Sequence, residues 1–187
     1  MRKIAITLTK GGTGKSTTAV NLAAGLASKG HRVLLVDTDT QGQASVMLGV
    51  EPQAGLAQLI EEEMAAEEVI VQARDNLSVL AGDHTLAGLK RTISLKDFGG
   101  EKVLTEALAP LRRRYDFIIM DTAPGWDSLT VNVLFYAQEI LAPVSMEVLS
   151  LQGLIEFEQR IKPIQKYHPR LSLRYVLPTL VDGRVRK

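Results

Sequence analysis

A glycine-rich loop with a lysine and a hydroxyl residue follows the first apolar run of the chain. Gly11, Gly12 and Gly14 allow positive φ angles and let an anion approach the backbone without a clash from a Cβ atom. The backbone N–H groups of such a loop, with the N-terminus of the helix that follows, bind phosphate. Lys15 would reach the β- and γ-phosphates, and the Ser16 hydroxyl would bind Mg²⁺. The loop therefore predicts a site for the phosphates of a nucleotide.

Two other interpretations of this loop compete with the first. A dinucleotide-binding fingerprint that starts at Gly12 has Thr17 where its third glycine is needed. Alternatively, the glycines simply make a tight turn. The strict phosphate-loop pattern also asks for a glycine five residues before Gly14, where this chain has Thr9. The end of that pattern is intact, and it favours nucleotide phosphates over both alternatives.

Two aspartates at the ends of apolar runs are candidates for the same metal ion. Asp121 closes a predicted buried strand, where an unpaired carboxylate would be costly, and Mg²⁺ bound through a water would compensate for it. Asp37 ends a second predicted strand and would hold the same metal shell. The alternative role for an aspartate after a strand is to cap a turn or a helix.

The composition is that of one globular domain spanning residues 1–187. The chain has 22 Lys and Arg against 21 Asp and Glu, a net charge of +1, with 45% hydrophobic residues. The lack of cysteine excludes disulfides and thiolate metal sites. No apolar stretch is long enough to cross a membrane and no signal peptide is evident, so we expect a cytoplasmic protein. A balanced charge means that any nucleic-acid binding needs a local basic patch.

Short apolar runs alternate with longer segments of helical periodicity, and these elements must position the candidate residues. The predicted strands are 4–9, 32–37, 76–80, 117–121, 139–144 and 171–177, and the predicted helices are 15–29, 56–73, 101–114, 127–137 and 151–167. Pro110 and Pro163 are expected to kink two of the helices or mark their ends.

The alternation predicts an α/β fold in three layers, with a mostly parallel sheet and helices on both faces. The runs at 33–36 and 117–120 are apolar without alternation, as expected of strands that are covered on both sides.

The segment Lys10-Gly-Gly-Thr-Gly-Lys-Ser-Thr17 resembles the deviant phosphate loop of the ParA/MinD ATPase family, in which the extra lysine is a signature. Residues 33–42, 115–124 and 176–184 are similar to three further motifs of that family, in the right order. The resemblance covers nearly the whole chain and is closer to ParA partition ATPases than to MinD. It implies a twisted P-loop NTPase sheet.

The resemblance also implies roles for individual residues. Lys10 would cross a face-to-face dimer to the partner's phosphates, and Asp39 would orient the attacking water. Pro178 stands near the position of a base-reading residue, and Thr40 replaces the usual proline of the second motif. Relatives typically continue past this length, so the chain is either a compact member or lacks C-terminal elements. The residues expected to contact the nucleotide are Lys10, Gly11, Gly12, Thr13, Gly14, Lys15, Ser16, Thr17 and Pro178, with Ser16, Asp37 and Asp121 at the metal.

As a function, the family implies an Mg²⁺-dependent ATPase that is weak on its own. ATP would drive a homodimer that binds DNA non-specifically, associates with the nucleoid and segregates a plasmid or chromosome, and a ParB-like protein would stimulate hydrolysis and release it. No membrane partner is expected. The candidate DNA contacts are the basic residues Arg112–Arg114, Lys162, Lys166, Arg170, Arg174, Arg184, Arg186 and Lys187, and the alternative for them is scattered solubilising charge.

Two other classes of function remain open at this point. The chain could position a protein cargo, such as a carboxysome, a chemoreceptor cluster or a division site, or be a regulatory relative. It could also be a metabolic synthase or an electron-transfer ATPase with the same loop. The missing cysteines argue against an iron–sulfur reductase, and the lack of an extra substrate domain argues against a synthase.

Overall fold

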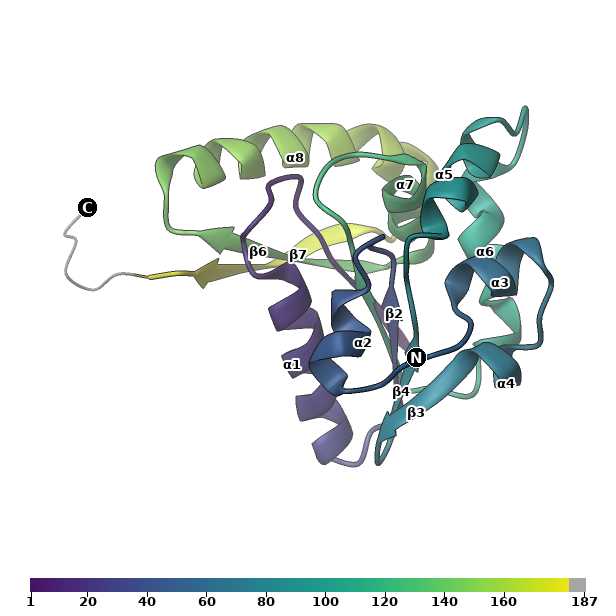
Figure 1. Ribbon diagram of the computed structural model, residues 1–187. Coiled ribbons are helices and arrows are strands. Elements are labelled where there is room, and N and C mark those ends of the chain that lie inside the picture. The colour runs from purple at the N-terminus through teal and green to yellow at the C-terminus, as the bar shows by residue number, and fades with distance from the viewer. Residues whose placement is uncertain (182–187) are drawn as a thin grey trace.

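Seven strands form one sheet in the order β3-β4-β2-β5-β1-β6-β7, shown in Figure 1. The computed structural model describes residues 1–181, apart from the side chain of Val148. All neighbouring strands are parallel except the pair β3 and β4, so the predicted mostly parallel sheet is confirmed. The strands are β1 (Arg2–Ile6), β2 (Val33–Asp37), β3 (Ile70–Arg74), β4 (Leu77–Leu80), β5 (Phe117–Asp121), β6 (Glu139–Ser145) and β7 (Ser172–Thr179).

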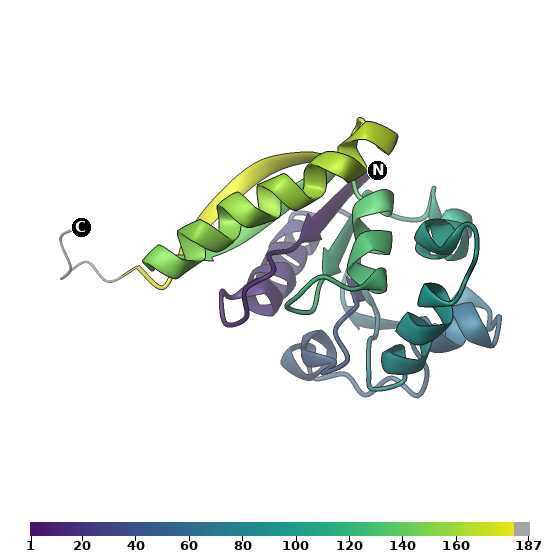
Figure 2. The ribbon, with the colours of Figure 1, turned by 90° about the horizontal axis from the view of Figure 1, so that it is seen from above.

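Helices cover both faces of the sheet, which confirms the predicted three layers (Figure 2). The helices α1 and α2 pack on one face, and α3, α5, α6, α7 and α8 pack on the other. The helices are α1 (Lys15–Ser28), α2 (Gln43–Leu48), α3 (Leu56–Glu61), α4 (Ala66–Val69), α5 (Leu86–Ser94), α6 (Val103–Ala107), α7 (Ser128–Tyr136) and α8 (Val148–Tyr167), with the 3₁₀ turns η1 (Gly100–Lys102) and η2 (Ala109–Leu111).

The central strands are buried on both faces, which explains their unbroken apolar sequence. In β2, Val33 and Leu35 join the cluster under α1, whereas Leu34 and Val36 join the cluster under the other helices. All five residues of β2 are buried. Because side chains alternate across a strand, a strand between two helical layers needs an apolar residue at nearly every position.

The predicted helix at 56–73 is wrong, because this segment holds two short helices and an edge strand. The helix α3 ends at Glu61, and Glu63 adopts a positive φ of 52° that stops it from continuing. After α4, strand β3 runs antiparallel to β4, and the turn between them has Asn76 at a φ of 60°. Asparagine tolerates this left-handed conformation, which suits a tight hairpin.

One more helix prediction needs correction. The segment at 101–114 is broken into η1, α6 and η2, with Pro110 in the first turn of η2, where a missing N–H costs little. In contrast, α8 continues through Pro163 to Tyr167, so Pro163 does not mark the end of its helix, and the expected kink stays a prediction. Neither α2 nor α5 was predicted from the sequence. The basic residues at 184, 186 and 187 lie outside the described residues.

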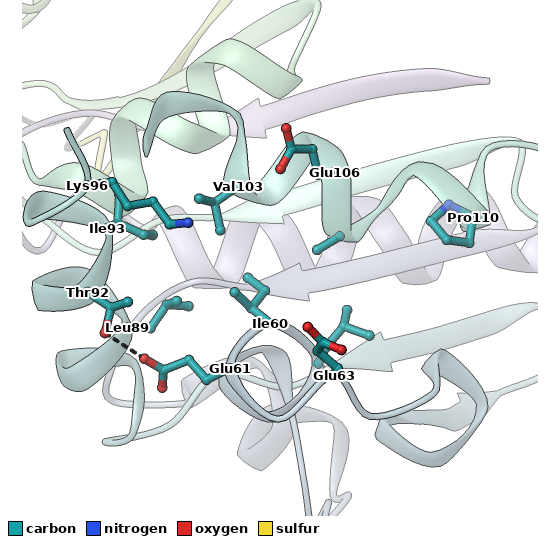
Figure 3. Close-up of a pocket in the computed structure, with 12 residues that line it drawn as sticks. Ile60, Glu61, Glu63, Leu89, Thr92, Ile93, Lys96, Val103, Glu106 and Pro110 are labelled. Carbon is teal, nitrogen blue, oxygen red and sulfur yellow. Dashed lines mark hydrogen bonds between the residues drawn. The ribbon is translucent and has the colours of Figure 1, made fainter. Parts of the chain in front are cut away.

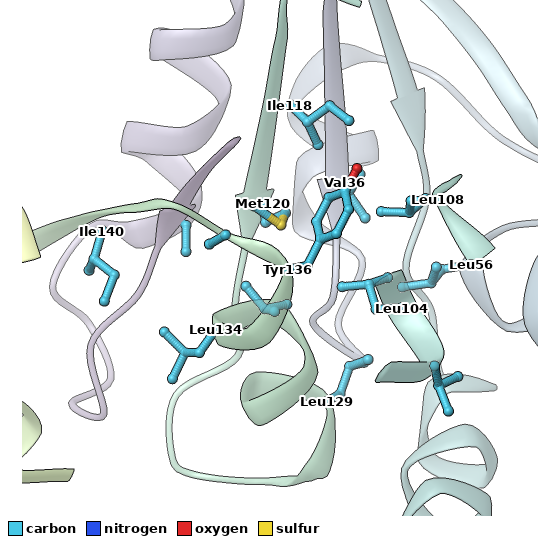
Figure 4. Packing of buried hydrophobic residues seen from close by; sticks show 14 of the residues in the cluster. Val36, Leu56, Leu104, Leu108, Ile118, Met120, Leu129, Leu134, Tyr136 and Ile140 are labelled. Atoms are coloured by element: carbon cyan, nitrogen blue, oxygen red, sulfur yellow. The ribbon is translucent and has the colours of Figure 1, made fainter. Parts of the chain in front are cut away.

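The helical layer above β2 and β4 leaves a groove between α3, α5 and α6 at the surface (Figure 3). Beneath it lies the larger hydrophobic core, in which Leu56, Leu104 and Leu108 pack near Val36 and Tyr136 (Figure 4). Of the helices in residues 1–181, none is both long and apolar enough to span a bilayer.

Replacing Pro163 with alanine should stabilise the protein. The Pro163 side chain is exposed, and the residue has no N–H to donate to the carbonyl oxygen of Gln159 one turn earlier. We expect Pro163→Ala to raise the free energy of unfolding by about 1–3 kcal/mol, measured by urea denaturation. The control Lys162→Ala, at the exposed neighbouring position, should change it by less than about 0.5 kcal/mol. A loss of stability in Pro163→Ala would contradict the prediction.

Candidate functional site

The glycine-rich loop lies at the carboxyl end of β1 and leads directly into α1. Gly14, the N-cap of α1, has a φ of 86°, and Gly12 has a φ of 71°. Only glycine adopts these angles readily, and they direct successive backbone N–H groups toward one point. Thr18 donates its N–H to the Gly14 carbonyl, so the helix begins within the loop.

A cavity of about 200 Å³ opens above this loop and collects most of the predicted residues. This volume is small for a whole-ligand pocket, so it suits phosphate groups, with the sugar and base outside. Asp39, which accepts the Gln41 N–H at 3.1 Å, reaches the cavity from the end of β2. The lining residues are Gly11, Gly12, Gly14, Lys15, Ser16, Thr17, Asp39, Thr122 and Pro124.

Lys15 is nearly buried, with 6% of its surface exposed. Its ammonium group donates a hydrogen bond to the Lys10 carbonyl oxygen at 2.8 Å, which holds the side chain along the loop. Burial lowers the pKa of Lys15, whereas the negative charges of Asp121 and Asp39 oppose that shift. An anion in the cavity would therefore gain a cation that is already oriented and largely desolvated.

Asp121 and Asp37 lie side by side, because β5 and β2 pair in register at these residues. Both are fully buried. Desolvation raises the pKa of Asp121 to about 6, although Ser16 and Lys15 favour its charged form. Desolvation and the Asp121 charge raise the pKa of Asp37 to about 7. Two adjacent buried carboxylates disfavour ionisation of each other.

The two carboxylates differ in how their oxygens are used. Asp37 accepts the N–H groups of Asp39 at 2.9 Å and Ala44 at 3.0 Å, so it caps the start of α2. Both oxygens of Asp121 are buried without a hydrogen-bond partner among the described residues. An unpaired buried carboxylate indicates a missing cation or water.

These residues fit Mg²⁺ that is shared with a phosphate ligand. No group of three or more His, Cys, Asp or Glu residues within the described chain could hold a metal. Mg²⁺ prefers oxygen ligands and usually keeps several waters, with few protein ligands and substrate phosphates. The free oxygens of Asp121 and the cavity-lining Ser16 hydroxyl supply that donor set, and Asp37 adds charge beside them.

Lys10 does not line the cavity. Its ammonium group pairs with Glu147, just before α8, at 3.0 Å. The Glu147 side chain is 66% exposed, and a solvated pair of this kind contributes less than about 1 kcal/mol. Lys10 is therefore held away from the loop's own anion site by a contact that is easily exchanged.

Comparisons with known proteins bear on this site. Residues 1–173 match the protein family described as an AAA domain. The chain is 38% identical to the chromosome-partitioning ATPase Soj of Thermus thermophilus, over 98% of this chain and 71% of that protein. It is 36% identical to the chromosome partitioning protein ParA of Myxococcus xanthus, over 98% of this chain and 66% of that one. The chain belongs to the ParA/MinD family. Among solved structures, the chain is similar to cobyrinic acid a,c-diamide synthase from Mycobacterium smegmatis with bound ATP analogue and magnesium, at a TM-score of 0.92. The two sequences are 32% identical, and the match covers 99% of this chain and 77% of that one.

In this member of the ParA/MinD family, the cavity is also lined by two residues that the sequence did not single out. Thr122 donates its hydroxyl to the Ile6 carbonyl at 3.1 Å, and Pro124 lines the cavity. Both lie within the segment 115–124, so that motif was the available signal. In contrast, Glu147 is 137 residues from Lys10, and no local pattern links them.

Pro178 is exposed and does not line the cavity. Its neighbour Thr179 donates a hydrogen bond to the Thr13 carbonyl at 2.9 Å and so connects β7 to the phosphate loop. The role of Pro178 in base binding stays a prediction. The Thr13 side chain is buried, and its hydroxyl has no partner among the residues described.

The Asp121→Asn variant should be more stable than the native protein near neutral pH, in the absence of Mg²⁺ and nucleotide. The folded-state pKa of about 6 lies above the ordinary value of 3.8, so the folded protein binds more protons between these values. As the pH rises from about 4 to about 6, Asp121 therefore lowers the free energy of unfolding progressively. The asparagine variant does not ionise and avoids this decrease. We expect a gain on the order of 2 kcal/mol at about pH 7.5 and little gain at about pH 4, measured by urea denaturation.

Asp116→Asn serves as a control with the opposite sign. The Asp116 side chain is 40% exposed and accepts a hydrogen bond from the Arg32 guanidinium at 2.8 Å, which lowers the pKa of that carboxyl. Replacing Asp116 with asparagine should lower the free energy of unfolding at neutral pH. The difference should be present above the unfolded-state pKa of the carboxyl and disappear as the pH falls through its lower folded-state pKa. If Asp121→Asn instead lost stability at neutral pH, the account of the buried pair would be wrong.

Proposed function

We propose that the chain is an Mg²⁺-dependent ATPase of the partition type, with weak activity on its own. The observation that carries this proposal is the buried, unpartnered Asp121 beside the nearly buried Lys15 at a phosphate-sized cavity. The names of the relatives, together with the ATP analogue and magnesium of the Mycobacterium smegmatis structure, support it.

Each residue of the cavity has a role in this proposal. The loop N–H groups and Lys15 bind the phosphates, with Thr17 at the start of α1, and Asp39 accepts a hydrogen bond from the attacking water. Ser16 and Asp121 would hold Mg²⁺, with Asp37 beside them; the ion neutralises the charge on the phosphates. The protein contributes mainly position and charge, because phosphoryl transfer needs little covalent assistance.

Dimerisation with ATP would complete the site. Lys10 sits at the loop without lining its own cavity, and its partner Glu147 is mostly exposed. In a face-to-face homodimer, Lys10 would exchange Glu147 for the phosphates bound to the other subunit. A cation supplied in trans accelerates GTP hydrolysis by roughly 10³–10⁵ in proteins where it has been measured.

The dimer would bind DNA non-specifically and associate with the nucleoid, and a ParB-like protein would stimulate hydrolysis and release it. Lys162 and Lys166 are exposed in the last turns of α8, whose start adjoins Lys10. A helix rises about 1.5 Å per residue, so these lysines lie about 20 Å or more from the Lys10 surface. DNA contact there would not compete with dimerisation.

Among the other candidates, Arg174 pairs with Glu139 at 3.5 Å and Arg114 pairs with Glu67.

Two alternatives are kept as outcomes of the tests. The same switch could position a protein cargo instead of DNA. An ATP-dependent amide-forming activity is the second candidate, because the Mycobacterium smegmatis structure carries the name of a diamide synthase. Neither alternative requires DNA binding.

Alanine variants of the two lysines of the loop should lose different functions. Lys15→Ala removes the desolvated cation of the cavity, so it should abolish ATP binding, measured by calorimetry. Lys10→Ala should leave ATP affinity within about threefold of the native protein, because this side chain does not line the cavity. It should nevertheless lose ATP-dependent dimerisation, measured by sedimentation, and partner-stimulated turnover. Normal dimerisation of Lys10→Ala would disprove the proposed exchange across the dimer.

DNA binding should depend on both nucleotide and salt. We expect binding of a random duplex only with ATP and Mg²⁺, and not with ADP or without nucleotide. The logarithm of the affinity should fall linearly with the logarithm of salt concentration, because phosphate contacts release counterions. The variant Lys162→Gln/Lys166→Gln should reduce the slope by roughly 0.9 for each lost contact.

Lys29→Gln, at the exposed end of α1 on the other face, is the matched control and should leave the slope unchanged. Equal DNA binding in all three nucleotide states would remove the switch from the proposal. ATP hydrolysis without DNA binding in any state would favour the positioning or amide-forming alternatives.

A further inference from the structure

A second surface feature has no part in nucleotide binding. The groove between α3, α5 and α6 has a volume of about 730 Å³, more than three times that of the phosphate cavity. It shares no residue with that cavity. Whatever it binds would therefore be separate from the nucleotide.

The floor of the groove is apolar. Leu89, Ile93 and Val103 belong to the hydrophobic core, and Leu59 and Ile60 are partly buried against it. Figure 3 shows Ile60 from α3 facing Leu89 and Ile93 from α5, with Val103 of α6 opposite. Leu59 and Ile60 keep part of their apolar surface exposed, and burial of that surface by a ligand would be favourable.

The rim of the groove is mainly acidic. Glu61 and Glu63 stand on the α3 side, and Glu106 stands on the α6 side, with Lys96 as the basic residue of the lining (Figure 3). All four side chains belong to exposed residues, and none forms an ion pair within the part of the chain that the structure describes. Glu61 accepts a hydrogen bond from Thr92 at 2.9 Å, which fixes one carboxylate at the rim.

The shape favours an elongated ligand over a small molecule. Six of the twelve lining residues are exposed, so the groove is an open trough and not an enclosed pocket. The trough continues past Ile93 and Lys96 into a smaller depression that includes Phe98, which is 93% exposed. Leu95, at the end of α5, is 72% exposed. Exposed apolar side chains beside a groove are typical of a protein interaction surface.

We propose that this groove binds a basic amphipathic helix of another protein. The apolar stripe of such a helix would cover Leu59 and Ile60, and its Lys or Arg residues would pair with the carboxylates on both sides. Helices commonly bind in grooves through apolar residues at i, i+3, i+4 and i+7. The charge complementarity selects a basic segment, because three carboxylates outnumber one ammonium group along the rim.

The test uses two synthetic helical peptides that share one leucine stripe. One peptide carries lysine on its polar face and the other carries glutamate at the same positions. Binding to the full chain is measured by fluorescence anisotropy at low and moderate salt. The basic peptide should bind at least about tenfold more tightly than the acidic one, and added salt should reduce the difference.

The variant Glu61→Lys/Glu106→Lys reverses one charge on each side of the groove. It should weaken the basic peptide about tenfold and strengthen the acidic one, without changing ATP binding. Glu156→Lys/Glu158→Lys, at exposed positions of α8, makes the same change in net charge elsewhere and should have no effect on either peptide. Ile60→Ser should weaken both peptides, because the apolar contact is common to them.

Several results would overturn the proposal. It fails if the two peptides bind equally, if neither binds, or if the groove and α8 variants behave alike. Concentration-dependent self-association that Glu61→Lys/Glu106→Lys abolishes would instead assign the groove to a second copy of this chain. Because the assay needs no nucleotide, a failure here leaves the proposed ATPase function untouched.

Discussion

Burying ionisable groups is costly unless other groups compensate, and this chain buries Lys15, Asp37 and Asp121 at one end of its sheet. Parallel strands end at the same edge, so the aspartates of β2 and β5 are brought into register. The backbone N–H groups at the start of α2 satisfy Asp37, whereas Asp121 keeps both oxygens free. An unpaired buried carboxylate beside a nearly buried lysine is suited to a ligand that carries both a cation and phosphates, as proposed above.

The groove and the phosphate cavity illustrate two ways in which a three-layer fold builds surfaces. The cavity depends on strand ends and backbone geometry, which tolerate little change. The groove depends on short helices laid side by side over β2 and β4, whose apolar faces do not fully cover one another. Surfaces of the second kind can diversify without disturbing the first, because they share no residue.

The central elements could be predicted because their sequence signals are local. The predicted strand at 117–121 matches β5 at both ends, and the loop from Gly11 to Ser16 lies where its pattern indicated. The strand β3 was missed because Leu56, Leu59 and Ile60 have genuine helical spacing, and no glycine or proline separates α3, α4 and β3. Contacts between distant residues, such as Lys10 with Glu147, arise because β1 and β6 pair in parallel and bring the segments after them together, and no sequence window contains both.

The hydrogen bond from Thr179 to the Thr13 carbonyl connects the outermost strand on one side of the sheet to the phosphate loop. Five consecutive residues of β7, from Arg174 to Pro178, are exposed, so this strand is covered less than those at the centre. An edge strand, which pairs with only one neighbouring strand, bends more readily than an interior strand. Because this hydrogen bond joins the two segments, a displacement of β7 would be transmitted directly to the backbone of the loop at Thr13.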